Sequence, residues 1–294
     1  MAKITEGTIP FKGYQTWFRR VGACEAGKIP LLVVNGGPGF PHNYMQSLDD
    51  LAAKGREVIY YDQIGCGNSP GPDAADFYSV ALFKEELANV IAGLGLKELH
   101  ILGQSWGGML LMDYLITEKP QDVKSVVISS SPASFPVFAD EINRLVNWLP
   151  PDVIAAIEKG IKEEKYDDPA FLAASDVYYS RHVVNLDPLP NFVAYSFEHQ
   201  SKVYVIMQGY TEFMAIGKLK DWDVSGRLHE ITVPTLLVSG VSDEVTPLLV
   251  KEEYDRIPNA EWHLLPGAHL IHVEKRDTYN RLVETFLTKQ EAAL

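Results

Sequence analysis

Four short, mostly apolar runs in the first half of the chain are the feature that most limits its fold. They span residues 30–34, 57–61, 99–102 and 123–128. Continuous apolar strands are typical of parallel sheets whose two faces are both covered by helices. The intervening segments 79–94 and 107–118 carry apolar residues at helical spacing. This alternation predicts an α/β fold with a mostly parallel central sheet and right-handed crossovers, preceded by a β-hairpin over residues 7–21.

The second half of the chain departs from this alternation. Helical patterns without strands cover residues 139–148, 152–165, 169–183 and 191–208. Strand patterns return at 234–239 and 260–265, and a helical pattern closes the chain at 274–289. A helical block of this length is too long to be a loop. We therefore predict one α/β core, residues 1–132 and 226–294, with a helical cap inserted at 133–225.

The composition excludes several classes of protein. The 294 residues include 26 Lys and Arg against 39 Asp and Glu, a formal net charge of −13 that disfavours binding to nucleic acid and to anionic membranes. Two cysteines, Cys24 and Cys66, are too few for a disulfide scaffold. The sequence has no signal-peptide pattern and no run of about 20 apolar residues. We expect a cytoplasmic protein with no membrane or nucleic-acid partner.

One motif predicts a nucleophile. Residues 103–107 read Gly-Gln-Ser-Trp-Gly, which matches G-x-S-x-G and lies directly between a predicted strand and a predicted helix. In that setting the glycines leave room for a sharp turn that exposes the hydroxyl of Ser105 at the carboxyl edge of the sheet. The following helix also directs backbone N–H groups at a developing oxyanion. This context predicts the α/β-hydrolase fold.

A serine nucleophile needs a histidine base and an orienting carboxylate, which follow it in the chain order Ser, Asp, His in this fold. Asp243, in the loop after the strand at 234–239, is the expected carboxylate, with the adjacent Glu244 as the alternative. His269, beside the Gly267 turn, is the expected base, with His272 as the alternative.

A glycine-rich loop follows the first buried strand. Residues 35–39 read Asn-Gly-Gly-Pro-Gly, at the position from which these folds supply the second oxyanion N–H. We expect this N–H, together with that of Trp106, to form a two-donor oxyanion hole. A phosphate-binding loop is a poorer interpretation, because Pro38 removes an N–H and no Walker lysine follows.

These motifs together resemble the proline iminopeptidases and related aminopeptidase and amidase members of the α/β-hydrolase superfamily. The resemblance runs through residues 36–39, 61–69, 103–108, 220–223, 243–247 and 268–269. It implies Ser105, Asp243 and His269 as the catalytic triad, Gly37 and Trp106 as oxyanion donors, and the helical insertion as a cap over the site. The family usually has histidine where this chain has Asn35.

The resemblance also implies a site for the free amino terminus of the substrate. Glu212 matches the family carboxylate of the cap, and Glu244 matches the one beside the triad aspartate. Two glutamates in a partly desolvated pocket supply the negative charge that a buried ammonium requires. Aromatic side chains can line an apolar pocket for a proline-sized ring, or belong to the core; they are Phe40, Tyr44 and Tyr204.

We therefore expect a serine hydrolase that releases N-terminal proline or other small residues from peptides, amides or esters through an acyl-enzyme. Its partners would be small peptide, amino-acid amide or ester substrates, and we expect no metal and no organic cofactor. The alternative is a carboxylesterase or lactonase without a free-amine requirement, and a non-catalytic member of the fold is a further one. The sequence leaves the natural substrate and the oligomeric state open.

Overall fold

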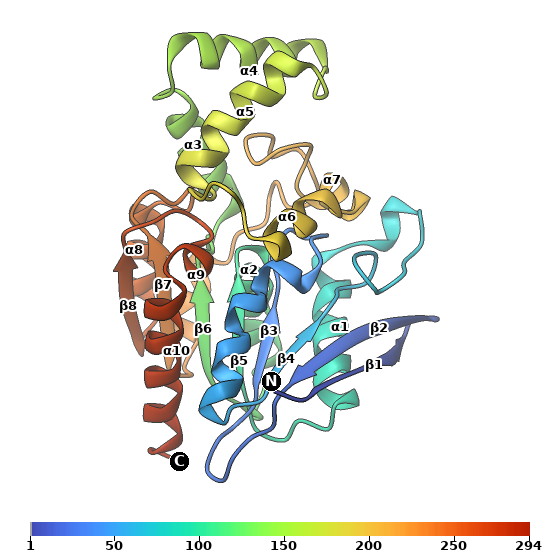
Figure 1. Cartoon of the computed structure of the whole chain (residues 1–294), viewed down its shortest axis with the longest axis vertical. Helices are drawn as coiled ribbons and strands as arrows, with labels where there is room; N and C mark the ends of the chain where they lie inside the picture. The colour runs from blue at the N-terminus through green and yellow to red at the C-terminus, as the bar shows by residue number, and fades with distance from the viewer. Residues whose placement is uncertain (1) are drawn as a thin grey trace.

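A single eight-stranded sheet forms the centre of the protein in the computed structural model, which describes residues 2–294 (Figure 1). The strands are β1 (Ile4–Phe11), β2 (Tyr14–Val21), β3 (Leu31–Val34), β4 (Val58–Tyr61), β5 (Leu99–Gln104), β6 (Val123–Ser129), β7 (Thr235–Gly240) and β8 (Ala260–Leu265). Their order is β1-β2-β4-β3-β5-β6-β7-β8. The β1–β2 hairpin and β2–β4 are antiparallel, and all other pairs are parallel. The predicted α/β-hydrolase sheet is confirmed.

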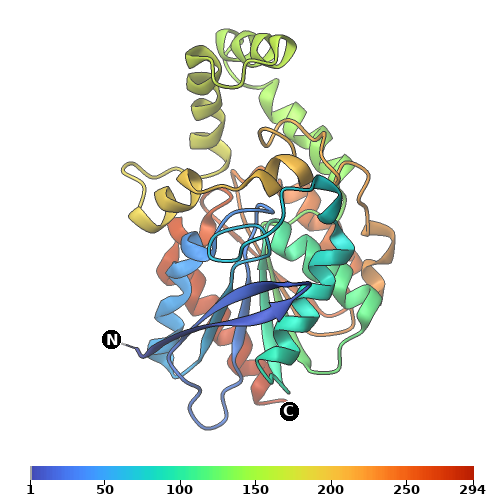
Figure 2. The ribbon, with the colours of Figure 1, turned by 90° about the vertical axis from the view of Figure 1, so that its right-hand side faces the viewer.

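Helices cover both faces of this sheet. The helices of the described residues, in chain order, are η1 (His42–Lys54), η2 (Ala75–Phe77), α1 (Val80–Gly93), α2 (Trp106–Glu118), α3 (Phe135–Val146), α4 (Pro151–Glu163), α5 (Pro169–His182), α6 (Asn191–Glu198), α7 (Lys202–Met207), η3 (Ser225–Glu230), α8 (Pro247–Arg256), α9 (Ile271–Glu274) and α10 (Arg276–Glu291). Seen from the side, η1 and α10 lie on one face of the sheet, and α1 and α2 lie on the other (Figure 2). Every residue of β3, β4 and β5 is buried, which explains the continuous apolar sequences of β3 and β4.

The segment between β6 and β7 contains α3 to α7 and lies above the carboxyl ends of the central strands, with α4 and α5 farthest from the sheet (Figure 1). Two of its helices, α5 and α7, begin at side-chain caps; at the start of α5, Asp168 accepts a hydrogen bond from Ala170 N. The extent of a separate cap domain, 133–225, stays a prediction.

The single helix predicted over 191–208 is wrong, because the structure has two helices there. After α6 ends, Ser201 starts α7 by accepting a hydrogen bond from Val203 N at 3.3 Å. The N–H of Ser201 donates to the Gly39 carbonyl at 2.9 Å. The break therefore places the start of α7 against the loop that follows β3.

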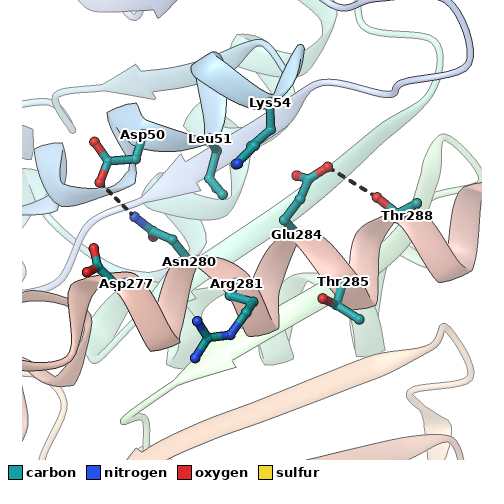
Figure 3. Close-up of a pocket in the computed structure, with 9 residues that line it drawn as sticks. All are labelled: Asp50, Leu51, Lys54, Asp277, Asn280, Arg281, Glu284, Thr285 and Thr288. Atoms are coloured by element: carbon teal, nitrogen blue, oxygen red, sulfur yellow. Dashed lines mark hydrogen bonds between the residues drawn. The ribbon is translucent and has the colours of Figure 1, made fainter.

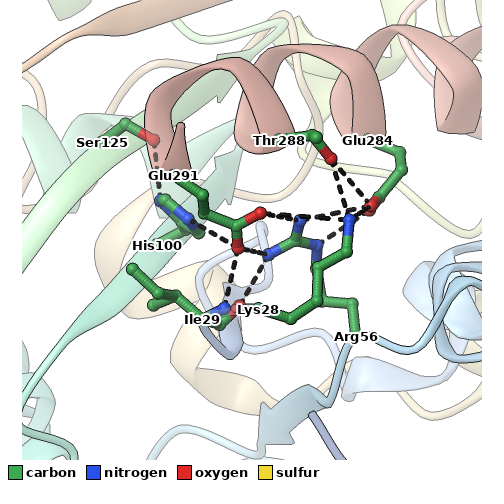
Figure 4. Close-up of polar contacts among 8 residues, drawn as sticks. All are labelled: Lys28, Ile29, Arg56, His100, Ser125, Glu284, Thr288 and Glu291. Atoms are coloured by element: carbon green, nitrogen blue, oxygen red, sulfur yellow. Dashed lines mark hydrogen bonds and ion pairs between the residues drawn. The ribbon is translucent and has the colours of Figure 1, made fainter. Parts of the chain in front are cut away.

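A buried ionic network ties α10 to the amino ends of the strands (Figure 4). Arg56 is fully buried and donates to Glu284 and Glu291 of α10 at 2.6 to 3.2 Å. His100, at the start of β5, shares a 2.8 Å hydrogen bond with Ser125. Burial, together with the nearby Arg56, lowers the pKa of His100 to about 4, so its ring is neutral. Between residues 2 and 294, no helix has the length and apolar character needed to cross a membrane.

Candidate active site

The candidate nucleophile, Ser105, occupies the sharp turn between β5 and α2. Its backbone has φ 55° and ψ −126°, a strained conformation for a residue with a side chain. Its N–H donates to the Ser129 carbonyl at 2.9 Å, and its carbonyl accepts a hydrogen bond from the Ser131 hydroxyl. A Cβ at Gly103 would overlap the backbone of Gly107. Close backbone packing therefore requires glycine on both sides of the serine.

The imidazole of His269 and the carboxylate of Asp243 are paired at the carboxyl ends of β7 and β8. His269 Nδ1 lies 2.9 Å from Asp243 Oδ1, and both side chains are buried. The N–H of Val245 donates to the same carboxylate oxygen at 2.8 Å and fixes its orientation. The sequence left Asp243 and Glu244 as alternatives, and the structure pairs Asp243 with the ring.

The other candidate base, His272, lies in α9 and takes no part in this pair. Its Nε2 lies 3.3 Å from the Tyr44 carbonyl. Burial lowers the pKa of His272 to about 3. A neutral ring directed at a backbone carbonyl is in position to hold η1 against α9, and not to relay protons.

Ser105 and His269 line one small cavity of about 40 Å³. The other residues that line it are Gly37, Phe40, Tyr44, Gln104, Val183, Phe197, Glu212 and Leu270. Within residues 2–294 no hydrogen bond joins the Ser105 hydroxyl to the His269 ring, as is often the case before substrate binds. The cavity is far below the ~300–1,000 Å³ of sites for larger ligands, which favours a small substrate group.

A larger cavity of about 570 Å³ lies elsewhere, between η1 and α10 (Figure 3). It is lined by Asp50, Leu51, Lys54, Asp277, Asn280, Arg281, Glu284, Thr285 and Thr288. These side chains mix acidic and basic groups and include no histidine or cysteine. We therefore place the candidate chemistry in the smaller cavity.

The candidate oxyanion loop follows β3. Gly37 has φ 120°, which glycine adopts readily, and a Cβ there would lie 2.7 Å from Phe40 N. Asn35, which replaces the family histidine, donates from Nδ2 to the Phe40 carbonyl at 2.5 Å and so closes the loop. The second candidate donor, Trp106 N, is the first N–H of α2 and has no carbonyl partner within the helix.

Tyr44 joins this loop to the strand that carries the nucleophile. Its hydroxyl accepts from Gly36 N at 2.5 Å and donates to Gln104 Oε1 at 2.6 Å. Its backbone N–H donates to Ser196 Oγ of α6 at 3.0 Å. The sequence suggested Tyr44 as a pocket-lining or core aromatic and gave no sign of its polar role, because the partners Gly36, Gln104 and Ser196 lie eight or more residues away.

Two glutamates lie beside the His269 ring. Glu244 is buried, with Oε1 3.8 Å from His269 Nε2 and with Oε2 accepting from the Tyr178 hydroxyl at 3.1 Å. Glu212 is partly buried, lines the cavity and accepts from the Tyr204 hydroxyl at 2.5 Å. The structure thus brings both candidate amine-binding carboxylates near His269, Glu244 by a direct approach to the ring and Glu212 through the cavity wall that they share.

The charges of this cluster perturb one another. Burial raises the pKa of Glu244, and the nearby Glu212 raises it further. Burial also raises the pKa of Glu212 against the opposing hydrogen bond from Tyr204. For His269, burial alone would lower the pKa, but the carboxylates of Asp243 and Glu244 outweigh it and raise the pKa to about 9.

Aromatic rings form the apolar wall of the site. Phe40 makes edge-to-face contacts with Phe197, Tyr204 and Tyr44 at ring-centroid distances of 5.4, 5.6 and 6.3 Å. Of the three aromatics named from the sequence, Phe40 and Tyr44 line the cavity, whereas Tyr204 positions Glu212. In the part of the chain that the structure describes, no group of three His, Cys, Asp or Glu side chains could hold a metal ion.

Comparison with known proteins gives consistent matches over the whole chain. Residues 29–276 match the family model described as alpha/beta hydrolase fold. The proline iminopeptidase of Lactobacillus delbrueckii subsp. lactis is 40% identical over 294 residues, which cover 98% of this chain and 100% of that protein. The proline iminopeptidase of Clostridium botulinum is 37% identical over 292 residues, which cover 98% and 100%.

Solved structures agree. The crystal structure of proline iminopeptidase from Mycobacterium smegmatis superposes with a TM-score of 0.92 at 36% identity, covering 98% of this chain and 99% of that one. The crystal structure of VinJ superposes with a TM-score of 0.94 at 34% identity, and the match covers 97% of this chain and 99% of VinJ. An esterase from Exiguobacterium antarcticum, at 19% identity and a TM-score of 0.72, shares the fold.

Proposed function

Since the chain belongs to the α/β-hydrolase family and is a hydrolase of the proline iminopeptidase type, we propose that it removes N-terminal proline or another small residue from peptides, amides or esters. The substrate would be held by its free amine, and the reaction would pass through an acyl-enzyme on Ser105.

The observation that carries this proposal is the presence of Glu212 on the wall of the same small cavity as Ser105 and His269. A carboxylate so close to the nucleophile can hold an ammonium only about one residue away from the scissile carbonyl. Glu244, which is 1% exposed, supplies a second carboxylate 3.8 Å from His269 Nε2. The apolar wall formed by Phe40 and Phe197 suits a small ring such as that of proline.

In the first half of the reaction, Ser105 Oγ attacks the scissile carbonyl carbon while His269 Nε2 takes the hydroxyl proton. Asp243 accepts from His269 Nδ1–H, which leaves Nε2 as the ring nitrogen that can accept the proton of Ser105. The N–H groups of Gly37 and Trp106 stabilise the oxyanion, and the imidazolium then gives its proton to the leaving amine or alcohol.

The second half releases the amino acid. His269 takes a proton from a water molecule that attacks the acyl carbon, and the same two N–H groups stabilise the second oxyanion. Collapse of this intermediate returns the proton to Ser105 Oγ and frees the product carboxylate. Each residue thus acts twice with the same geometry.

The test compares three substrates on purified protein: proline p-nitroanilide, its N-acetylated form and p-nitrophenyl acetate. We expect a preference of 100-fold or more in kcat/KM for the free amine over the N-acetylated amide, and a large loss of that preference in Glu212→Gln. Equal rates on blocked and free amides would contradict the proposal and favour an esterase.

We also infer a cytoplasmic location from the two unpaired cysteines, which cell fractionation would test.

A further inference from the structure

The candidate base is turned toward a carboxylate in the substrate-free protein. His269 Nε2, the nitrogen that would accept the serine proton, lies 3.8 Å from Glu244 Oε1. His269 Nδ1 is already on Asp243 at 2.9 Å. The ring therefore lies between two carboxylates, and within the described residues it makes no hydrogen bond to Ser105.

The charged groups that act most strongly on the ring are carboxylates. Asp243 and Glu244 face it from the loop after β7, and Glu212 faces it from the segment after α7. The hydroxyls of Tyr178 and Tyr204 touch the two glutamates.

Two other histidines lie near His269. His272, in α9, has a neutral ring. The backbone carbonyl of His182 accepts a hydrogen bond from His269 N at 3.1 Å. His182 itself lies 3.0 Å from the Ser242 carbonyl, and burial lowers its pKa. In residues 2–294 no lysine or arginine forms an ion pair with Asp243, Glu244 or Glu212.

Among the ion pairs of residues 2–294, the imidazolium of His269 is thus the only cation paired with Asp243 and Glu244. The same carboxylates raise the pKa of His269 to about 9, against the effect of burial. A protonated ring cannot accept the proton of Ser105, so the substrate-free site holds its base in an inactive form at neutral pH.

We propose that the ammonium of the substrate switches on the general base by replacing the imidazolium as the partner of Glu244 and Glu212. The proposal rests on the proposed function, because it needs the amine to bind at these carboxylates. When the ammonium binds, His269 releases its extra proton to solvent, and Nε2 becomes a free acceptor for Ser105. One proton leaves for each ammonium that enters, so the net charge of the cluster is unchanged.

This arrangement would make the amine a requirement for turnover as well as for binding. A substrate without an ammonium leaves the imidazolium as the only cation of the cluster, so its base stays protonated even when the substrate is bound. Selectivity would then appear in kcat, and it would disappear at a pH high enough to deprotonate His269 without help.

The test is a pair of pH profiles on the intact protein. The rate of p-nitrophenyl acetate hydrolysis that depends on Ser105 is obtained by subtracting the rate of Ser105→Ala. We expect this rate to be roughly 30-fold or more lower at pH 7 than at pH 9.5. For proline p-nitroanilide, the acid limb of kcat reports the pKa of the base in the enzyme–substrate complex. We expect this limb to lie at least one pH unit below the acid limb for p-nitrophenyl acetate. Acid limbs that coincide for the two substrates would overturn the proposal.

A variant gives a second readout. In Glu244→Gln we expect the acid limb for p-nitrophenyl acetate to move to lower pH and its rate at pH 7 to rise severalfold, while turnover of proline p-nitroanilide falls. Glu253→Gln is the matched control, because Glu253 is equally buried, at 1% exposure, but lies in α8 and is absent from the cavity wall. An acid limb for p-nitrophenyl acetate at the same pH in Glu244→Gln as in the wild type would refute the switch.

The two proposals fail in different ways. If blocked and free amides react equally at every pH, the aminopeptidase function is wrong. If the free amine is preferred but the acid limbs coincide, the function stands and the switch is refuted. Should Glu244→Gln not fold, the two wild-type profiles still decide.

Discussion

Tyr44→Phe tests how the oxyanion loop is held in place. The substitution keeps the ring but removes the hydroxyl that accepts from Gly36 N and donates to Gln104 Oε1. Both partners are buried, and a buried polar group left without a partner costs about 1–3 kcal/mol. Gly36 precedes the candidate donor Gly37, so the loop should lose its fixed position relative to Ser105.

The expected effect on catalysis is bounded from above. Removing an entire oxyanion donor costs about 3 kcal/mol of transition-state stabilisation. Tyr44 is not a donor itself but positions the loop of the candidate donor Gly37, so its removal should cost less. We therefore expect kcat to fall about 10- to 100-fold at nearly constant KM, because each 1.4 kcal/mol or so is tenfold in rate. The free energy of unfolding should fall by about 1–3 kcal/mol.

Steady-state kinetics on proline p-nitroanilide and urea denaturation measure the two effects. Tyr61→Phe is the matched control, because the Tyr61 hydroxyl is fully buried and has no hydrogen-bond partner in the described chain. It should leave kcat within about twofold of the wild type. A Tyr44→Phe protein with wild-type kcat, or one whose loss lies entirely in KM, would refute the positioning role.

Three further predictions follow from other parts of the molecule. Ser105→Ala should abolish turnover and labelling by a fluorophosphonate, and labelling of that variant at the wild-type rate would exclude Ser105 as the nucleophile. Burial raises the pKa of Glu86 to about 7, so the folded state binds more protons than the unfolded state between about pH 4.5 and 7 and stability falls as pH rises through that window. Glu86→Gln should remove up to about 3 kcal/mol of this fall in urea denaturation at pH 5 and 8, and an unchanged slope would contradict it. Glu291→Ala leaves the buried Arg56 short of a partner and should destabilise the fold by about 3–5 kcal/mol while kcat of the folded protein stays constant, which thermal unfolding and active-site titration check.

The sequence was sufficient to predict the sheet and the order of the site motifs because both depend on local pattern. The fully buried strands β3 and β4 are uninterrupted apolar runs in the sequence, and the turn at Ser105 needs glycines on both sides whatever surrounds it. The helical character of residues 42–54, by contrast, was not predicted, and the structure forms the 3₁₀ helix η1 there, with Tyr44 at its amino end.

Features set by contacts distant in sequence could not be predicted. The break between α6 and α7 depends on Ser201 donating to Gly39, a residue of another loop. The polar role of Tyr44 depends on Gly36 and Gln104 in the same way. The approach of Glu244 to His269 Nε2 arises only when the ends of β7 and β8 are brought together.

The buried network of Arg56 also has a practical consequence for protein engineering. Glu291 lies in the last turn of α10, and it anchors a guanidinium that has no access to water. A truncation that removes the last turn of α10 should therefore destabilise the fold, and the whole helix should be kept in any engineered variant. This anchor and Ser105 lie at opposite ends of the parallel strands. Variant libraries that diversify the segment between β6 and β7 can therefore be screened for new substrates while the contacts that stabilise the other end of the sheet stay unchanged.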